Sequence, residues 1–149
     1  PGWTVMQATA GTWGLNRLPY ERHRPEGVQK LLEDIAQARP DALFLLMEPR
    51  MVTYSAIIAD FAASHRIPAL AAWGKFTELG GVLSYATSLP DVCLRSANYV
   101  DKILKGTKPA QLPIEQPDKF ELEINMKTAR ALGIAIPKDL MLRATKLIE

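Results

Sequence analysis

Apolar residues recur along the chain with two spacings, one typical of helices and one typical of buried strands. Val28, Leu32 and Ile35 are spaced by four and three positions, which places them on one face of a helix. Short, almost uninterrupted apolar runs indicate strands that are covered on both faces of a parallel sheet. The pattern predicts helices over 26–38 and 53–65 and strands over 41–46 and 67–72. Two successive strand–helix units predict an α/β fold with a parallel sheet.

The remaining segments follow the same signals, with glycine and proline marking their ends. Residues 5–13 have the pattern of a helix that Gly14 closes, with no strand before it, and 15–20 is a short extended candidate. Pro90 suits the first turn of a helix, and Gly106 stands just past its end. The further elements expected are a strand over 83–85, a helix over 89–105, an extended connector over 108–117, a strand over 120–124, and helices over 126–132 and 138–148.

Composition places the chain among ordinary globular domains. It has 149 residues, of which 48% are hydrophobic and 23% charged, with a formal net charge of +2. This content is too apolar for a disordered chain and too evenly charged for a nucleic-acid-binding protein. Asp60, Arg66 and Pro68 interrupt the most hydrophobic stretch, so we expect no membrane span, and the first residues do not have the pattern of a signal peptide.

Motifs that announce an enzyme or a metal site are missing from the sequence. There is no phosphate-binding loop, dinucleotide fingerprint, zinc-protease helix or nucleophile elbow. Cys93 with His23 or His65 could act as a nucleophile and its base, but a buried or half-buried helix cysteine is the preferred interpretation. One cysteine and two histidines match no zinc spacing. We therefore predict no catalytic residues, metal or cofactor.

The informative polar and aromatic residues follow the predicted strands. Ligands bind beyond the carboxyl ends of the strands in open parallel sheets, and three predicted strands end at such residues. A carboxylate, a guanidinium, aromatic rings and hydroxyl groups suit a small polar ligand with an apolar part. The alternative is that the two charged residues form a solvated pair and that the aromatic residues belong to the core. The candidates are Glu48, Arg50, Trp73, Phe76, Ser84 and Tyr85.

The second half of the chain resembles a known family through a series of motifs in order. The series runs through Arg66-Ile67-Pro68-Ala69-Leu70, Phe76-Thr77-Glu78-Leu79-Gly80-Gly81-Val82-Leu83-Ser84-Tyr85, Tyr99 to Ala110, Leu112 to Pro117, Phe120-Glu121-Leu122, Ile124 to Ala129, Leu132-Gly133-Ile134 and Ile136-Pro137. It is similar to the ABC-transporter substrate-binding proteins that include tryptophan- and phenylalanine-binding members. Before residue 66 the likeness is mainly one of layout.

The resemblance implies a type I periplasmic-binding-protein fold, with two doubly wound α/β lobes that close on a ligand. Such proteins are about twice as long, so this chain is expected to be an incomplete, carboxyl-terminal portion. Residues 1–82 would be part of the second lobe without its first strand, 83–117 the hinge crossings and a first-lobe segment, and 118–149 the return to the second lobe. If the first lobe is absent, a homodimer or a domain swap would cover the exposed apolar surface.

The resemblance also implies a role for several residues. Glu48 stands where family members often carry an acidic residue for the amino group of the ligand, Ser84 and Tyr85 match the hinge-side pair, and Asp91 can reach the cleft. Arg50 departs from the small residues usual there and favours a carboxylate or another anion. The function implied is non-catalytic capture of an amino-acid-like or carboxylated solute for membrane permease subunits, in the periplasm or anchored to the cell envelope. The alternative is a ligand-sensing domain of a regulator with the same fold.

Overall fold

The computed structural model describes residues 6, 9–16, 18–19 and 27–149 and divides into two compact units, Pro1–Pro40 and Asp41–Glu149. In the first unit, residues 6 and 9–12 are helical, and Gly14 has the left-handed φ of +66° expected of a residue that ends a helix. Residues 15–16 and 18–19 form no strand, and the rest of the extended candidate lies outside the described residues. Helix α2 (Gly27–Ala38) buries the predicted apolar face.

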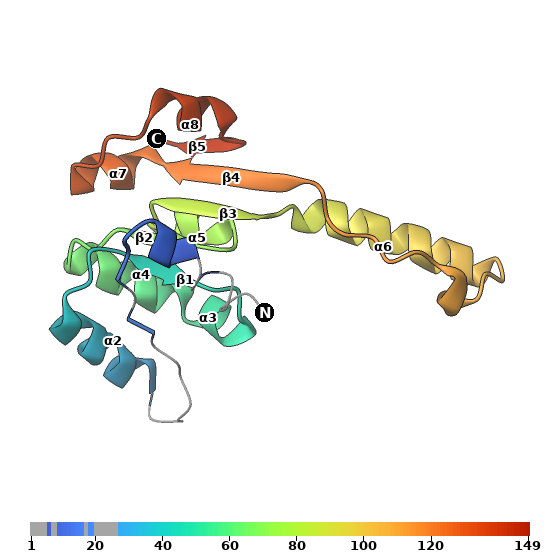
Figure 1. Ribbon diagram of the computed structural model, residues 1–149, viewed down its shortest axis with the longest axis horizontal. Coiled ribbons are helices and arrows are strands. Elements are labelled where there is room, and N and C mark those ends of the chain that lie inside the picture. The colour runs from blue at the N-terminus through green and yellow to red at the C-terminus, as the bar shows by residue number, and fades with distance from the viewer. Residues whose placement is uncertain (1–5, 7–8, 17, 20–26) are drawn as a thin grey trace. The chain divides into compact units, whose positions relative to one another are not determined.

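The second unit contains a five-stranded sheet with the order β1-β2-β3-β4-β5 (Figure 1). The first three strands are parallel, as predicted, whereas β4 runs antiparallel to β3, and β5 runs parallel to β4. The sheet is therefore mixed, and only its first half has the arrangement in which strand ends gather ligand-binding residues. The strands are β1 (Leu43–Leu45), β2 (Ala69–Ala71), β3 (Leu83–Thr87), β4 (Phe120–Asn125) and β5 (Lys146–Ile148).

The helices of this unit confirm most of the sequence predictions and correct their bounds. The predicted helix over 53–65 corresponds to α4, and two short helices that the pattern did not predict lie before it and after β2. Within the described part of the chain, no helix is long and apolar enough to cross a membrane. The helices are α3 (Pro49–Thr53), α4 (Ser55–Ser64), α5 (Lys75–Glu78), α6 (Leu89–Leu104), the 3₁₀ turn η1 (Pro109–Gln111), α7 (Met126–Leu132) and α8 (Lys138–Arg143).

The prediction of one last helix over 138–148 is wrong. Helix α8 ends at Arg143, Ala144 is extended with φ −67° and ψ 133°, and residues 146–148 form β5. Thr145 makes the change of direction possible, because both its backbone N–H (2.7 Å) and its hydroxyl (2.8 Å) donate to the carbonyl of Leu122. Pairing with β4 thus outweighs the helical spacing of the side chains.

The sheet has one face that carries α5. Ser84 pairs directly with Glu123, so their side chains lie on the same face, and Glu123 contacts Thr77 of α5. Helix α4 contacts α5 and buries Ile58, Ala59 and Ala62. The acidic side of β4 is therefore not fully in water, as the alternation of its sequence had suggested, but half-buried beneath a helix.

Helix α6 and the segment that returns from it form an arm that extends beyond β3 and β4 (Figure 1). We define the arm as residues 88–119. Its base is closed by the N–H of Ser88, which donates to the carbonyl of Lys119 at 2.9 Å. No residue of α6 is buried, and Cys93, predicted to be buried or half-buried, is exposed. The correction has a simple reason, because the described chain lays only one extended segment against this long helix.

Candidate functional site

The carboxyl ends of β1 and β2 lie level with Ser84 of β3, and we call this boundary the strand-end edge. Leu45 pairs with Ala71, Ala71 pairs with Ser84, and the N–H of Ala72 donates to the carbonyl of Leu45 at 3.1 Å. Strand β3 was predicted to end at Tyr85 but continues past this boundary to Thr87, paired with β4. The residues that follow the paired positions include Glu48 after β1, Trp73 after β2, and Tyr85 in the middle of β3.

Glu48 lies at the turn from β1 into α3 and is exposed. Its carbonyl accepts the N–H of Val52 at 3.1 Å, the first hydrogen bond of that short helix, which fixes its backbone. Arg50 belongs to α3, and its side chain lies outside the part of the chain that the structure describes. The edge thus begins with an exposed carboxylate on a defined turn, which can attract a cationic group.

Trp73 and Phe76 face the interior to different degrees. Phe76 has no exposed surface, and a Cβ placed on Gly81 would lie only 2.3 Å from its ring, so this ring is core packing. Trp73 is 8% exposed and meets Phe76 edge to face, with 5.6 Å between ring centroids. Of the two, only Trp73 has any surface at the strand-end edge.

Ser84 and Tyr85 point to opposite faces of β3, as successive residues of a strand do. Ser84 is fully buried on the face that carries α5, and its Oγ is the one buried side-chain polar atom among the described residues that has no hydrogen-bond partner. A buried hydroxyl without a partner costs about 1–3 kcal/mol, so such atoms are uncommon. Tyr85 is 54% exposed on the other face.

Phe120 completes an aromatic pair that the sequence did not reveal. Its ring stacks on Tyr85 with 5.4 Å between centroids and 12° between planes, and it is 45% exposed. Tyr85 pairs with Leu122 and Thr87 pairs with Phe120, so the two rings are diagonal neighbours on one face. The alternation of residues 120–124 places Phe120 on the face of Leu122, but the register with β3 is needed to bring it to Tyr85.

Asp91 is engaged at the base of the arm. Its Oδ2 accepts Nε–H of Arg95 at 2.9 Å, and Arg95 also pairs with Asp118 and lies 3.8 Å from Glu115. The hydrogen bond to Asp91, followed by the charges of Asp118 and Asp91 and then of Glu115, raises the pKa of Arg95 above its ordinary value. The carboxylate of Asp91 is therefore paired within α6, rather than standing free at the strand-end edge, and Arg95 links α6 to the returning segment through Asp118 and Glu115.

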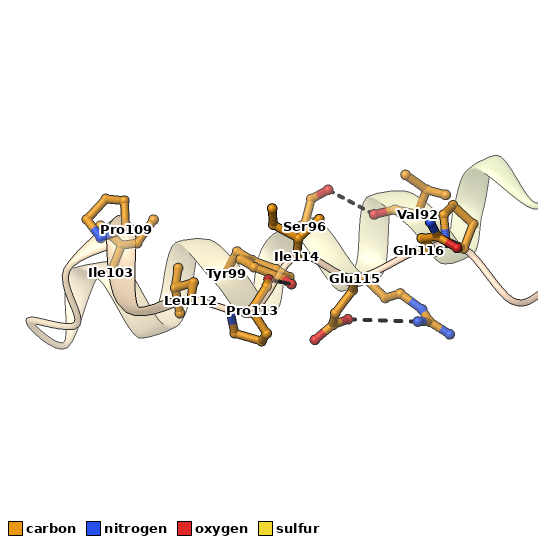
Figure 2. Close-up of a pocket in the computed structure, with 12 residues that line it drawn as sticks. Val92, Ser96, Tyr99, Ile103, Pro109, Leu112, Pro113, Ile114, Glu115 and Gln116 are labelled. Carbon is orange, nitrogen blue, oxygen red and sulfur yellow. Dashed lines mark hydrogen bonds and ion pairs between the residues drawn. The ribbon is translucent and has the colours of Figure 1, made fainter. Parts of the chain in front are cut away.

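A groove of about 470 Å³ runs along the arm between α6 and the returning segment (Figure 2). Ile103, Leu112 and Ile114 contribute much of its apolar lining, and Ile114 is 99% exposed. The hydroxyl of Tyr99 donates to the carbonyl of Pro113 at 2.6 Å and holds the returning segment against the helix. The groove is separate from the strand-end edge, because all of its lining residues belong to the arm.

The residues of the catalytic alternative lie on separate elements. His65 follows α4, with Nδ1 3.0 Å from the carbonyl of Phe61, whereas Cys93 lies on the arm. His23 lies outside the described residues. Within the described ranges, no group of three His, Cys, Asp or Glu side chains is placed to hold a metal ion.

The family model described as "ABC transporter substrate binding protein" matches residues 7–148. A comparison with curated proteins gives no match.

Solved structures share the fold over almost the whole chain. One, described as a conserved domain protein from Vibrio cholerae, has a TM-score of 0.88 at 23% identity over 97% of this chain and 49% of its own. An ABC domain in complex with L-Trp from Streptococcus pneumoniae has a TM-score of 0.90 at 21% identity over 99% of this chain and 50% of its own. A ligand-free, open substrate-binding protein with adhesive properties from Clostridium difficile has a TM-score of 0.66 at 16% identity, over 98% of this chain and 48% of its own. The chain spans about half the length of these proteins.

Proposed function

Because the chain belongs to the ABC transporter substrate-binding protein family, we propose that it forms part of a non-catalytic receptor for a small amino-acid-like or carboxylated solute. The observation that carries the proposal is the strand-end edge. Strands β1 and β2 end there beside β3, and the residues after the paired positions are a carboxylate, an indole and an exposed phenol. This is the place where open parallel sheets bind ligands.

Each side chain of the edge suits one part of such a solute. Glu48 would take the ammonium group through a charged hydrogen bond, and Arg50 would take a carboxylate. The Tyr85–Phe120 pair offers two stacked, nearly parallel rings against which a flat apolar group can pack, and Trp73 follows the neighbouring strand β2. The unpartnered Oγ of Ser84 would gain a hydrogen bond to a polar atom of the solute, or to a group that the solute orders.

The arm is proposed to belong to the other lobe of the receptor. Helix α6 buries none of its residues, and its exposed apolar residues include Leu94, Val100 and Leu104. We propose that residues 1–82 and 118–149 form one lobe and that 83–117 contain the hinge crossings and a segment of the other. Asp91 would then act at the hinge through Arg95. If that lobe is lacking, a second copy of the chain would cover the same surface by dimerisation or a domain swap.

The proposed receptor works outside the cytoplasm, in the periplasm or anchored to the cell envelope, and delivers its solute to the membrane subunits of an ABC permease. The family supports this proposal, and so does the length of the relatives, of which this chain covers about half. The L-Trp bound to the structure from Streptococcus pneumoniae makes aromatic amino acids the first solutes to test.

Calorimetry on the full-length protein tests the proposal. We expect binding of one or more solutes from a panel of aromatic, aliphatic and basic amino acids and simple carboxylates. Tyr85→Ala should weaken binding of the aromatic members more than that of the aliphatic members, because only the former lose a stacking partner. Lys105→Ala removes an exposed ion pair with Asp101 on the arm and serves as the matched control. A folded protein that binds no member of the panel would contradict the proposal.

A further inference from the structure

Helix α5 has four residues, too few to be stable without contacts from elsewhere in the protein. It begins two residues after Trp73, so whatever holds α5 also decides where Trp73 stands at the strand-end edge. Its side-chain hydrogen bonds to other elements and its ion pair come from β4 and β5, while β2 and β3 also pack against it. β4 and β5 supply none of the ligand-binding residues predicted from the sequence, although β4 carries Phe120.

One of these contacts is made by Glu123. Thr77 is fully buried, and its hydroxyl lies 2.6 Å from both Oε2 of Glu123 and the carbonyl oxygen of Gly74, so its one proton is shared between the two acceptors. A Cβ placed on Gly74 would lie 2.5 Å from Oε1 and 3.0 Å from Cδ of the same carboxylate. Gly74 has φ −64°, which any residue can adopt, so space rather than backbone conformation explains the glycine. The carboxylate therefore fits against the backbone where α5 begins.

Two further contacts hold the end of α5. The amide of Asn125 donates to the carbonyl of Thr77 at 2.9 Å, while its Oδ1 accepts the N–H of Thr128 at 2.8 Å and caps α7. Lys146 donates to Oε1 of Glu78 at 2.5 Å, but both side chains are about half exposed. Exposed ion pairs contribute little to stability, so the buried hydrogen bond from Asn125 to Thr77 stabilises the end of α5 more than the Lys146–Glu78 pair does.

We propose that Glu123 is a positioning residue, whose carboxylate fixes α5 through Thr77 and Gly74 and thereby holds the Trp73 indole at the strand-end edge. This inference rests on the proposed function only for the part that Trp73 plays in binding. The position of Trp73 itself can be measured without any solute, so the two ideas can fail separately.

The first test uses fluorine NMR on full-length protein labelled with fluorotryptophan, with Trp73→Phe to assign the resonance. Thr77→Val and Glu123→Ala should shift the Trp73 resonance and raise its exposure to a soluble quencher severalfold. Thr77→Ser and Glu123→Gln retain the hydroxyl and an accepting oxygen, so both should keep the resonance near its wild-type position. A purely structural loss would not separate the conservative from the disruptive variants in this way.

The second test uses the close approach of the carboxylate to Gly74. Gly74→Ala should displace the carboxylate and shift the Trp73 resonance, because the added Cβ needs the space that Oε1 occupies. In the Glu123→Ala background, the same substitution should cause little further shift. Strict additivity of the two changes would overturn the close contact, and with it the proposal.

Binding measurements separate the positioning role of Glu123 from the proposed solute-binding function. For any solute that the wild-type protein binds, Thr77→Val should weaken affinity roughly tenfold, the scale of one hydrogen bond. Unshifted resonances in the folded Thr77→Val and Glu123→Ala variants overturn the inference. A shifted resonance with unchanged affinity removes Trp73 from the solute site and supports the positioning role of Glu123. If the wild-type protein binds no solute, the proposed function fails, while the resonance still decides whether Glu123 positions Trp73.

Discussion

The tightest packing of a glycine in the described chain predicts a large effect of one added methyl group. Gly81 stands just before β3, and a Cβ built there would lie 2.3 Å from Cδ1 and 2.6 Å from Cε1 of Phe76. It would also lie 3.0 Å from the carbonyl oxygen of Phe76, which belongs to the backbone and cannot swing away. Substitution with alanine must therefore move either the ring or the start of the strand.

The ring has little room to move. Phe76 has no exposed surface, and Trp73 packs against it with 5.6 Å between centroids. Overpacking of a filled core costs about 1–3 kcal/mol, and the additional backbone contact places Gly81→Ala at about 2 kcal/mol or more. Phe76→Leu alone should cost about 1.5 kcal/mol, but it makes room for the methyl group. We expect the double variant to be more stable than the sum by about 1 kcal/mol.

Urea unfolding of the full-length protein, followed by circular dichroism, measures these free energies of unfolding. Gly11→Ala is the control, because this helical glycine has no heavy atom within 4 Å of an added Cβ. It should leave stability unchanged or raise it by about 0.5–1 kcal/mol, as alanine favours helix. A Gly81→Ala variant within about 0.5 kcal/mol of the wild type, or a strictly additive double variant, would refute the packing argument.

Three further predictions concern the edge and α5. Glu48→Ala should weaken solute binding by about 1.5–3 kcal/mol, the scale of a charged hydrogen bond, and unchanged affinity by calorimetry would remove Glu48 from the site. Phe120→Ala should cost about 0.5–1.5 kcal/mol of binding for aromatic solutes, and equal losses for aliphatic ones would speak against stacking on Tyr85. Lys146 lowers the pKa of Glu78, mainly by a hydrogen bond, so the pair stabilises the fold above the ordinary carboxyl pKa of about 4.3 and this stabilisation is lost as the pH falls through the lowered pKa. In Glu78→Gln, the free energy of unfolding should lose the part of its pH dependence that comes from this pair. An acid unfolding profile identical to that of the wild type would contradict the prediction.

Elements with strong local signals were predicted well. Helix α7 has the predicted bounds, because Asn125 caps its start and Gly133, with φ +75°, ends it. Strand β5 was missed because a side-chain pattern does not contain the backbone pairing with β4 that selects it. Helix α5 was missed for a related reason, since contacts from Glu123 and Asn125 hold it in place.

Some features of the candidate site could be predicted from the sequence, and others could not. The parallel order of β1, β2 and β3 follows from the sequence and is confirmed, but β3 continues to Thr87, past the end at Tyr85 that its pattern predicted. The sequence does not tell which aromatic ring faces the core. Phe76 and Tyr85 were both predicted to lie at or just after strand ends, and only the packing of Phe76 against Gly81 distinguishes them. Phe120 required the register between two strands that the arm separates in sequence.

That separation also affects how the protein folds. β4 pairs with β3 at five positions, from Leu83 with Ile124 to Thr87 with Phe120, and the whole arm must be closed into a loop before these pairs can form. The entropy of closing a loop grows with its length, and contacts within the loop shorten it. The Tyr99–Pro113 hydrogen bond and the ion pairs of Arg95 are such contacts, so formation of the arm would speed the pairing of the central strands.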